Sequence, residues 1–245
     1  MRKHILLAAV PIAVLTLSGT SVAAAAEPPP PPRTTIVGGV PATETYTFMT
    51  SLQQGGRHGC GGSLVGASWV VTAEHCGQPT QVRIGTRTWN AGGEVRSVAS
   101  RQVLGGDVAL LRLSSPSAMK PISIAASAPV GSATRLIGWG QTCPTRGCGG
   151  PPVQLQQLDT TIVEPGRCDG IQDAEICTDG GNGRGACYGD SGGPAVTGGP
   201  GAWELVGATS RGGDTCAQAP AIYGDVTAYR EQIMRIIGGG AAANR

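Results

Sequence analysis

The 245-residue sequence is poor in aromatic and charged side chains, which make up 4% and 14% of it. No run of Lys or Arg occurs. Residues 1–35 hold three of the eighteen basic and one of the sixteen acidic side chains, so fifteen of each sign remain without them. A balanced charge of this kind excludes a broad positive surface for nucleic acid or an anionic membrane, and we expect neither as a partner.

The sequence also lacks an apolar run of about 20 residues, the length that a helix needs to cross a bilayer. Ile5–Leu17 supplies only thirteen residues. Arg2 and Lys3 precede this run and four alanines, 23–26, follow it, so residues 1–26 are predicted to be a signal peptide. The eight cysteines agree with secretion, because an even number in an exported chain normally forms disulfides.

Glycine and proline, in contrast, are abundant, with 40 and 18 residues. From residue 47 onward, short runs of β-forming residues recur between glycine-rich turns. A dozen short strands without helices between them predict an all-β barrel or sandwich and argue against a parallel α/β sheet. The expected strands are Thr47–Gln53, Gly62–Val65, Trp69–Thr72, Gln81–Ile84, Glu94–Ser100, Val108–Leu113, Thr134–Gly138, Gln156–Val163, Glu175–Thr178, Pro194–Val196, Trp203–Ser210 and Ala221–Val226.

One helix is expected near the end of the chain, at residues 227–237. Thr227 is a suitable N-cap, and four apolar residues that follow it fall on one face. Gly238–Gly240 are expected to end the helix and to leave 238–245 as a flexible tail. The apolar face consists of Tyr229, Ile233, Ile236 and Ile237.

The strongest local motif is GDSGGP at residues 189–194. A serine hydroxyl becomes a good nucleophile when a base removes its proton and fixed donors stabilise the oxyanion. The glycines around Ser191 allow backbone N–H groups to converge without obstruction. The same letters fit the Gly-x-Ser-x-Gly elbow of lipases and esterases, whose histidine follows the serine. No histidine follows Ser191, which excludes that class.

Only three histidines are available as a base, and His4 lies in the predicted signal peptide. His75 directly follows an apolar strand and precedes Cys76, whereas His58 lies in a loop-like stretch. From these residues alone both remain candidates. Asp107 precedes the nearly all-apolar run VALLRL, where an unpaired carboxylate would be costly. A hydrogen bond to a histidine N–H would relieve that cost.

His75 in TAEHC, Asp107 in DVALLRL and Ser191 in GDSGGP resemble the three signatures of the chymotrypsin/trypsin family of serine proteases, in the family's order. The resemblance extends over residues 36–237. It implies a serine endopeptidase that works through an acyl-enzyme, with Ser191 as nucleophile, His75 as general base and Asp107 as the residue that orients the base.

The resemblance also implies the fold, namely two six-stranded antiparallel β-barrels with the active site in the cleft between them. We place the barrels at approximately 36–122 and 123–226, within one protease domain of residues 36–245. No cofactor is expected. The expected partners are protein and peptide substrates and protein protease inhibitors, and the expected state is a monomer.

The proline-rich segment EPPPPPRTT at 27–35 is interpreted as a propeptide, because the sequence IVGG follows it at Ile36. In the family, cleavage before such an isoleucine frees an amino group that pairs with the acid preceding the nucleophile, here Asp190. This pair orders the loop whose Gly189 and Ser191 N–H groups form the oxyanion hole. Thr34 and Thr35 depart from the usual basic residue before the cleavage site, so the activating protease is not trypsin-like, or it cuts after Arg33 and another enzyme trims the rest. His58 matches a family position that can hold the acid before the nucleophile, here Asp190, in the uncleaved precursor.

The resemblance implies three disulfides, and the two remaining cysteines then form a fourth. Cys143 and Cys148 lie five residues apart, and the alternative of a metal site there lacks a nearby histidine or a second cysteine pair. No metal site is expected. The disulfides are therefore Cys60–Cys76, Cys143–Cys148, Cys168–Cys177 and Cys187–Cys216.

The expected substrate pocket is apolar and uncharged. Gly185 stands where trypsin-like members carry an aspartate that attracts Arg or Lys. Ala221 takes the place of a glycine found in wide pockets, unless the loop length shifts the alignment by one residue. Arg211 and Glu74 depart from the family's usual tryptophan and alanine, and the sequence does not decide whether Glu74 makes the imidazole more basic or only faces solvent. The expected substrate-binding residues are Gly185, Ala186, Ser210, Gly212 and Ala221.

Cleavage after apolar residues is therefore expected, in preference to cleavage after Arg or Lys. The competing function is a binding protein that has lost catalysis, whose usual mark is a replaced catalytic residue, and none is replaced here. Sixteen arginines against two lysines, with frequent Ala and Gly, are typical of a GC-rich genome and indicate a bacterial source.

Overall fold

The computed structural model describes residues 36–242, in which fourteen strands, three 3₁₀ turns and one α-helix are found. The predicted signal peptide and propeptide lie outside the described residues. The strands are β1 (Val40–Pro41), β2 (Met49–Gln54), β3 (Arg57–Gly66), β4 (Trp69–Ala73), β5 (Gln81–Ile84), β6 (Glu94–Gly105), β7 (Val108–Leu113), β8 (Ser123–Ile124), β9 (Ala133–Gly138), β10 (Gln156–Val163), β11 (Glu175–Thr178), β12 (Pro194–Thr197), β13 (Glu204–Arg211) and β14 (Ala221–Asp225).

The first six long strands close into an antiparallel barrel in the order β2-β3-β4-β7-β6-β5. β7 is apolar at five of its six positions, and only Arg112 of this strand is exposed. Its residues pack with those of β2, β3 and β4 in a core that includes Leu52, Leu64 and Leu110. Burial of this apolar area is the main source of the barrel's stability.

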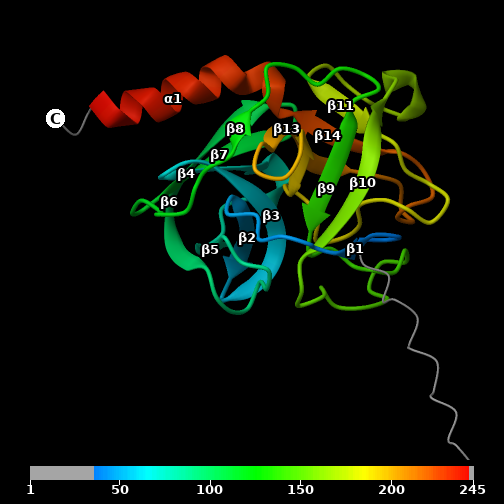
Figure 1. The fold of residues 1–245 in the computed structure, drawn as a ribbon, viewed down its shortest axis with the longest axis horizontal. Coiled ribbons are helices and arrows are strands. Elements are labelled where there is room, and N and C mark those ends of the chain that lie inside the picture. Colours follow the sequence, from blue (N-terminus) through cyan, green and yellow to red (C-terminus); the bar gives the residue numbers. More distant parts are fainter. Residues whose placement is uncertain (1–35, 243–245) are drawn as a thin grey trace, which may run out of the picture. The chain divides into compact units, whose positions relative to one another are not determined.

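The second barrel is formed by β9, β10, β11, β14, β13 and β12, and the pairing of β9 with β10 closes it. All six neighbouring pairs are antiparallel. Two further short strands add to this sheet, β1 beside β10 and β8 in parallel with β13. Figure 1 shows the two barrels, with β2 to β7 in blue to green and β9 to β14 in green to orange.

The expected fold class of two six-stranded antiparallel barrels and a C-terminal helix is confirmed. All twelve expected strands are present, and four have the expected bounds. The two that the sequence did not predict, β1 and β8, have only two residues each. Such strands carry no readable alternation, since a period of two needs about four residues to be visible.

The C-terminal helix differs from the expectation at both ends. A 3₁₀ turn, Val226–Tyr229, comes first, and the α-helix α1 spans Arg230–Ala242. The cap is Asp225 and not Thr227, because the Asp225 carboxylate accepts the N–H groups of Thr227 and Ala228. The three glycines do not end the helix, so the expectation of a flexible tail from residue 238 was wrong for 238–242. A glycine in a helix costs only about 1 kcal/mol and does not by itself terminate it.

The helix follows the second barrel in sequence but packs on the first. Ile233 is fully buried in the core that contains β3 and β4 residues, and Ile237 lies against Gly66 of β3. Arg230 Nε donates to the carbonyl of Ile124 at 3.2 Å. In Figure 1 the red helix runs alongside β4, β7 and β8. The C-terminal segment therefore ties the two barrels together.

Candidate active site

His75 and Asp107 both lie at the edge of the first barrel. His75 occupies the 3₁₀ turn Glu74–Cys76 that follows β4, and a disulfide links Cys76 to Cys60 on β3. Asp107 occupies the turn between β6 and β7, with a left-handed φ of 55°. Its carbonyl accepts the Glu74 N–H at 2.9 Å. The two loops are thus joined through the backbone as well as through side chains.

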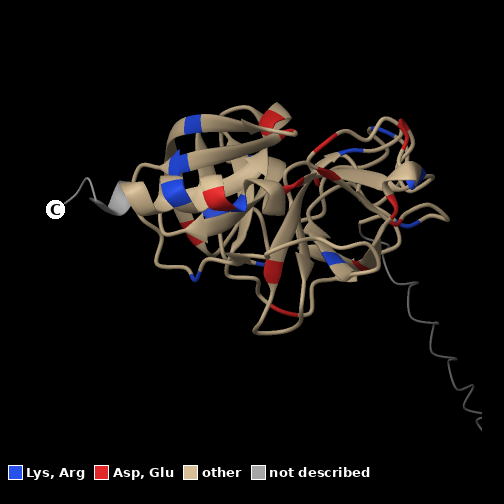
Figure 2. Ribbon diagram, turned by 90° about the horizontal axis from the view of Figure 1, so that it is seen from above, with Lys and Arg blue, Asp and Glu red and all other residues tan. Residues whose placement is uncertain are grey.

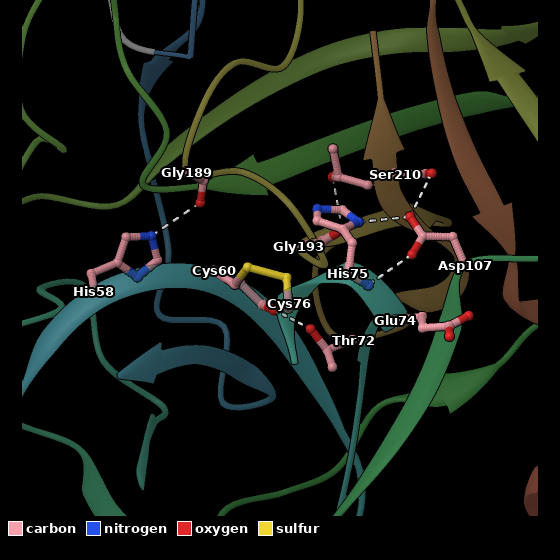
Figure 3. Close-up of a disulfide and its surroundings, with 12 residues drawn as sticks. His58, Cys60, Thr72, Glu74, His75, Cys76, Asp107, Gly189, Gly193 and Ser210 are labelled. Atoms are coloured by element: carbon pink, nitrogen blue, oxygen red, sulfur yellow. Dashed lines mark hydrogen bonds and ion pairs between the residues drawn. A yellow bond between two sulfur atoms is a disulfide. The ribbon is translucent and has the colours of Figure 1, made fainter. Parts of the chain in front are cut away.

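The Asp107 carboxylate holds His75 by two hydrogen bonds. Oδ2 lies 2.8 Å from His75 Nδ1, and Oδ1 accepts the His75 backbone N–H at 3.0 Å. Ser210 Oγ, on β13 of the second barrel, donates to Oδ2 at 2.6 Å (Figure 3). Burial raises the pKa of Asp107, but the hydrogen bonds from His75 and Ser210 outweigh it and bring the pKa below its ordinary value. The carboxylate is therefore ionised at neutral pH.

Ser191 lies in the loop that leads into β12. Its carbonyl accepts the N–H of Gly61 on β3 at 2.7 Å, and the Gly192 N–H that follows donates to Thr209 at 2.7 Å. Ser191 and His75 line the same cavity, of about 450 Å³. Within residues 36–242, no hydrogen bond joins Ser191 Oγ to the His75 ring. The structure therefore brings His75 and Ser191 to one cavity, whereas Asp107 does not line it and is linked directly to His75.

The backbone N–H groups of Gly189 and Ser191 are free to bind a ligand, since neither donates a hydrogen bond to any described residue. Gly189 has a φ of +100°, which an L-residue rarely adopts. A Cβ at this position would lie 3.2 Å from Gly140 Cα. Glycine at 189 is thus needed for both the backbone conformation and the close approach.

Asp190 points away from Ser191 into the protein, and it is only 2% exposed. Its carboxylate accepts the N–H groups of Gly140 at 2.8 Å and Cys187 at 2.9 Å. Burial raises the pKa of Asp190 to about 6, although these two bonds act in the opposite direction. No Lys, Arg or His among the described residues forms an ion pair with it.

Ile36 is also buried, with 1% of its surface exposed, and belongs to the core of the second barrel. The next residue, Val37, accepts the Gly185 N–H at 2.9 Å and so connects this segment to the pocket. In the 245-residue chain the Ile36 nitrogen is part of a peptide bond. No ion pair between the Ile36 amino group and Asp190 is therefore possible in this chain.

His58 forms no hydrogen bond or ion pair with Asp190 among the described residues. Its Nδ1 lies 2.8 Å from Ser51 Oγ. Its Nε2 lies 3.1 Å from the carbonyl oxygen of Gly189, as Figure 3 shows. Burial lowers the pKa of His58 to about 4, against the effect of the Gly189 hydrogen bond. The ring is therefore neutral at pH 7 and lies away from Asp107.

The predicted substrate-binding residues all line the cavity that His75 and Ser191 share. Gly185, Ser210 and Ala221 are buried and Gly212 is exposed at the mouth. Asp214 is the one carboxylate among the lining residues, and it is exposed. Arg146 lies over the ring of Tyr188, 5.2 Å from its centroid. The cavity wall therefore carries charges at its rim and none at Gly185, Ala186 and Ala221.

The structure also identifies a partner for Arg211 that sequence analysis missed. The Glu175 carboxylate, on β11, accepts a hydrogen bond from Arg211 Nη2 at 2.8 Å. The Glu175 side chain is only 3% exposed. The two residues are 36 positions apart, and no sequence pattern connects them. Glu74, whose role the sequence left open, lies 4.0 Å from Arg101 and is 45% exposed, so it faces solvent.

The four disulfides in the structure are the predicted pairs, namely the three that the resemblance implies and the fourth between the remaining cysteines: Cys60–Cys76, Cys168–Cys177, Cys187–Cys216 and Cys143–Cys148. Within the described residues, no group of three or more His, Cys, Asp or Glu side chains is arranged to hold a metal ion. No helix in this part of the chain is long and apolar enough to cross a membrane. Acidic and basic residues are spread over both barrels (Figure 2).

Comparison with known proteins gives consistent matches. The trypsin family model matches residues 36–233. Trypsin delta of Drosophila erecta is 36% identical over 228 residues, which cover 82% of this chain and 87% of the relative. Trypsin alpha-4 of Lucilia cuprina is 37% identical over 227 residues, covering 81% and 86%. Neuropsin, a serine protease expressed in the limbic system of mouse brain, has a TM-score of 0.70 and 29% identity over 78% of this chain and 94% of its own.

Two closed six-stranded barrels, together with these relatives, define a serine endopeptidase that acts on proteins. The chain belongs to the trypsin family. The resemblance to the chymotrypsin/trypsin family is thereby confirmed. The bacterial origin inferred from composition is not supported, because the sequence relatives named above are insect trypsins.

Proposed function

We propose that this endopeptidase cleaves peptide bonds through an acyl-enzyme, with Ser191 as nucleophile, His75 as general base and Asp107 as the group that orients the base. The observation that carries the proposal is the pair of hydrogen bonds by which Asp107 holds His75 at the cavity that Ser191 lines. A fixed Nδ1–H leaves Nε2 as the acceptor for a proton.

In the proposed reaction, Ser191 Oγ attacks the carbonyl carbon of the scissile peptide and its proton passes to His75 Nε2. The carbonyl oxygen becomes an oxyanion, which the N–H groups of Gly189 and Ser191 stabilise. Protonated His75 then gives its proton to the leaving amine, and the C–N bond breaks. Water, deprotonated by His75, hydrolyses the acyl ester in the same manner.

We further propose that the chain is secreted and matures by cleavage before Ile36. Asp190 supports this, because a buried carboxylate without a cationic partner is costly. A free ammonium group at Ile36 would supply that partner and fix the loop that bears Gly189 and Ser191. Protein protease inhibitors are proposed as partners of the mature, monomeric enzyme.

Labelling with a sulfonyl fluoride tests the assignment of the nucleophile. We expect one modified residue per chain, at Ser191, in material whose N-terminus is Ile36. Ser191→Ala and His75→Ala should lower kcat by about 10⁵–10⁶, because the catalytic residues act as a unit. Equal damage from His58→Ala would mean that His75 is not the base. Unchanged activity of Ser191→Ala would overturn the mechanism.

We propose, as a finer point, a preference for apolar residues before the scissile bond. The relatives named above are called trypsins, and the family resemblance implies that trypsin-like members attract Arg or Lys with an aspartate at the position of Gly185. Here Gly185 and Ala186 offer no countercharge, so a buried cation would lose its water without compensation. Burial of an unpaired charge costs several kcal/mol, whereas an apolar side chain gains about 1.5–3 kcal/mol.

Matched peptides that end in Leu, Phe and Arg test this preference. The kcat/KM should be highest for Leu, since the Ala221 methyl group shortens the pocket, and lowest for Arg. Gly185→Asp should shift the preference toward Arg, and Gly212→Asp, at the exposed mouth, serves as the matched control. A preference of the unmodified enzyme for Arg would show that a carboxylate such as Asp214 reaches the bound side chain.

A further inference from the structure

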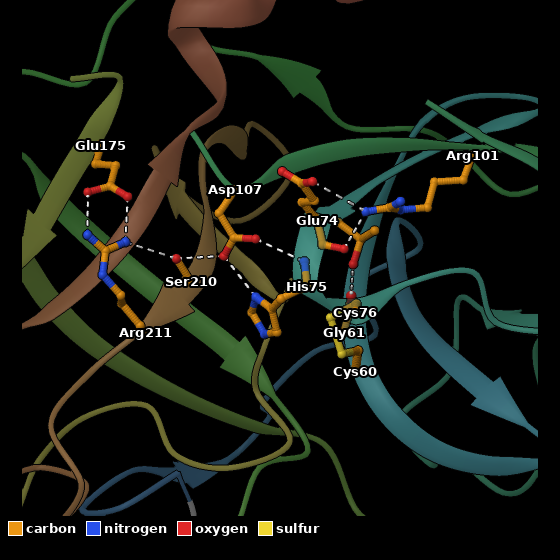
Figure 4. A network of polar contacts seen from close by, with 11 residues as sticks. Cys60, Gly61, Glu74, His75, Cys76, Arg101, Asp107, Glu175, Ser210 and Arg211 are labelled. Carbon is orange, nitrogen blue, oxygen red and sulfur yellow. Dashed lines mark hydrogen bonds and ion pairs between the residues drawn. A yellow bond between two sulfur atoms is a disulfide. The ribbon is translucent and has the colours of Figure 1, made fainter. Parts of the chain in front are cut away.

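The pair Glu175–Arg211 lies beside the hydrogen bonds that hold His75. Arg211 Nη1 donates to Ser210 Oγ at 3.3 Å, and Ser210 Oγ donates to Asp107 Oδ2 at 2.6 Å. Figure 4 shows the resulting chain from Glu175 through Arg211 and Ser210 to Asp107 and His75. The guanidinium therefore lies within about 6 Å of the Asp107 carboxylate, a distance at which charges interact appreciably near a protein surface.

The position of Arg211 is fixed by several contacts. Both of its terminal nitrogens bind the Glu175 carboxylate, and Nη2 also donates to the carbonyl of Gly170 at 2.7 Å. Glu175 is held in turn by the Gln172 N–H at 2.7 Å. A bidentate Arg–carboxylate pair of this kind has a defined geometry. The Arg211 guanidinium faces Ser210 and Asp107, and the Glu175 carboxylate is buried behind this guanidinium.

We propose that Arg211 and Glu175 are positioning residues that tune, through Ser210 and Asp107, how strongly the site stabilises protonated His75. This inference rests on the proposed function. The Arg211 charge offsets part of the attraction between Asp107 and an imidazolium at His75. Glu175 in turn offsets part of the Arg211 charge. The pair thus shifts the acid limb of the pH–rate profile, which is the range on the acidic side where kcat/KM falls as pH decreases.

Other charged or titratable groups near the site are arranged differently. Glu74, next to His75, points to solvent, and Arg101 on β6 donates to its carbonyl at 2.5 Å. The Tyr229 hydroxyl lies against Gly105 and Gly106, beside Asp107, and is neutral at working pH because burial raises its pKa. Among the described residues, Arg211 is the one cation joined to the Asp107 carboxylate through a hydrogen-bonded side chain.

The two partners are expected to shift the acid limb of kcat/KM in opposite directions. In Arg211→Met, protonated His75 loses a repulsive charge, so the limb should move to higher pH. In Glu175→Gln, the Arg211 charge is uncompensated, so the limb should move to lower pH. Each shift should be about 0.3–0.5 pH unit for partly exposed charges at this distance. A merely structural pair would not give shifts of opposite sign.

The experiment uses the chain that begins at Ile36 and measures kcat/KM from about pH 4.5 to 9. The pH dependence of Ser191 labelling by a small organophosphate is measured in parallel, because Arg211 also lines the substrate cavity. Arg211→Lys keeps the charge and should leave the limb near its original position. Arg96→Met removes a comparable pair with Glu94, at 2.7 Å on the first barrel, and should not move it.

The inference would be overturned if the acid limb stays in place in Arg211→Met and Glu175→Gln, or if it moves in the same direction in both. If Glu175→Gln does not fold, the contrast between Arg211→Met and Arg211→Lys still decides. Failure of the proposed function is recognised separately. It would appear as activity that survives Ser191→Ala. If only the present inference fails, activity still depends on Ser191, His75 and Asp107.

Discussion

The backbone N–H of Gly61 donates to the carbonyl of Ser191 at 2.7 Å, and this bond joins the first barrel to the nucleophile loop of the second. A Cβ at Gly61 would lie 2.7 Å from Gly193 Cα. The two glycines therefore allow the barrels to approach where His75, on one, and Ser191, on the other, must meet.

This close approach predicts that Gly61→Ala lowers kcat/KM by about 10- to 100-fold, because the methyl group displaces the nucleophile loop by a fraction of an ångström. Gly59→Ala is the matched control. It lies on the same strand, and a Cβ there meets nothing within 4 Å. Peptide hydrolysis by both variants gives the comparison. Equal activity of the two would mean that the contact does not position Ser191.

Asp107→Asn is expected to lower kcat by about 10⁴ with little change in KM, because an amide favours the wrong imidazole tautomer. Asp159→Asn is a suitable control, since Asp159 also pairs with a basic side chain, Arg135, at 2.6 Å but does not line the cavity. Steady-state kinetics at pH 8 distinguish the two variants. A loss below 10-fold in Asp107→Asn would contradict the assigned role.

His58 should make stability depend on pH. Its pKa is lowered to about 4 in the folded state, whereas an unfolded histidine titrates near 6.5. The unfolded state therefore binds more protons in this window, and stability falls as pH decreases from about 6.5 toward 4. His58→Gln should remove about 2–3 kcal/mol of this dependence between pH 7 and 4.5, as measured by urea unfolding. Parallel curves for the two proteins would argue against a buried neutral ring.

Asp190 should titrate differently before and after cleavage at Ile36. In the 245-residue chain its pKa is raised to about 6, because the carboxylate is buried without a cation, and a chain that begins at Glu27 should keep this pKa. In a chain that begins at Ile36, the new ammonium group should lower this pKa well below 6. Carbon-13 NMR of the carboxyl group measures both. The same pKa in the two chains would exclude the pairing.

The same cleavage should control activity. The chain beginning at Glu27 is expected to react slowly with sulfonyl fluoride, and the chain beginning at Ile36 rapidly. Asp190→Asn should stay inactive after correct cleavage, since a neutral amide cannot pair with the ammonium group. Full activity of the Glu27 form would contradict the zymogen interpretation.

Local features of the sequence were sufficient to predict an all-β chain of short strands, whereas the two barrels followed from the resemblance to the family. Runs such as VALLRL at 108–113 and the glycine-rich turns between them report burial and chain reversal directly. The start of the C-terminal helical segment was predicted less well, because Asp225 and Thr227 are both suitable N-cap residues. Backbone geometry decided between them, since the extended Asp225 directs its carboxylate at two free N–H groups.

By itself the sequence determined the family, the strand pattern and the residues proposed for catalysis, because GDSGGP, TAEHC and DVALLRL are short motifs of fixed chemistry. Only the tertiary structure decided which distant groups meet. It joined Glu175 to Arg211 across 36 positions and directed His58 to Gly189 across 131. Such pairs depend on strand register and on barrel closure, and both involve contacts between strands that are far apart in the sequence.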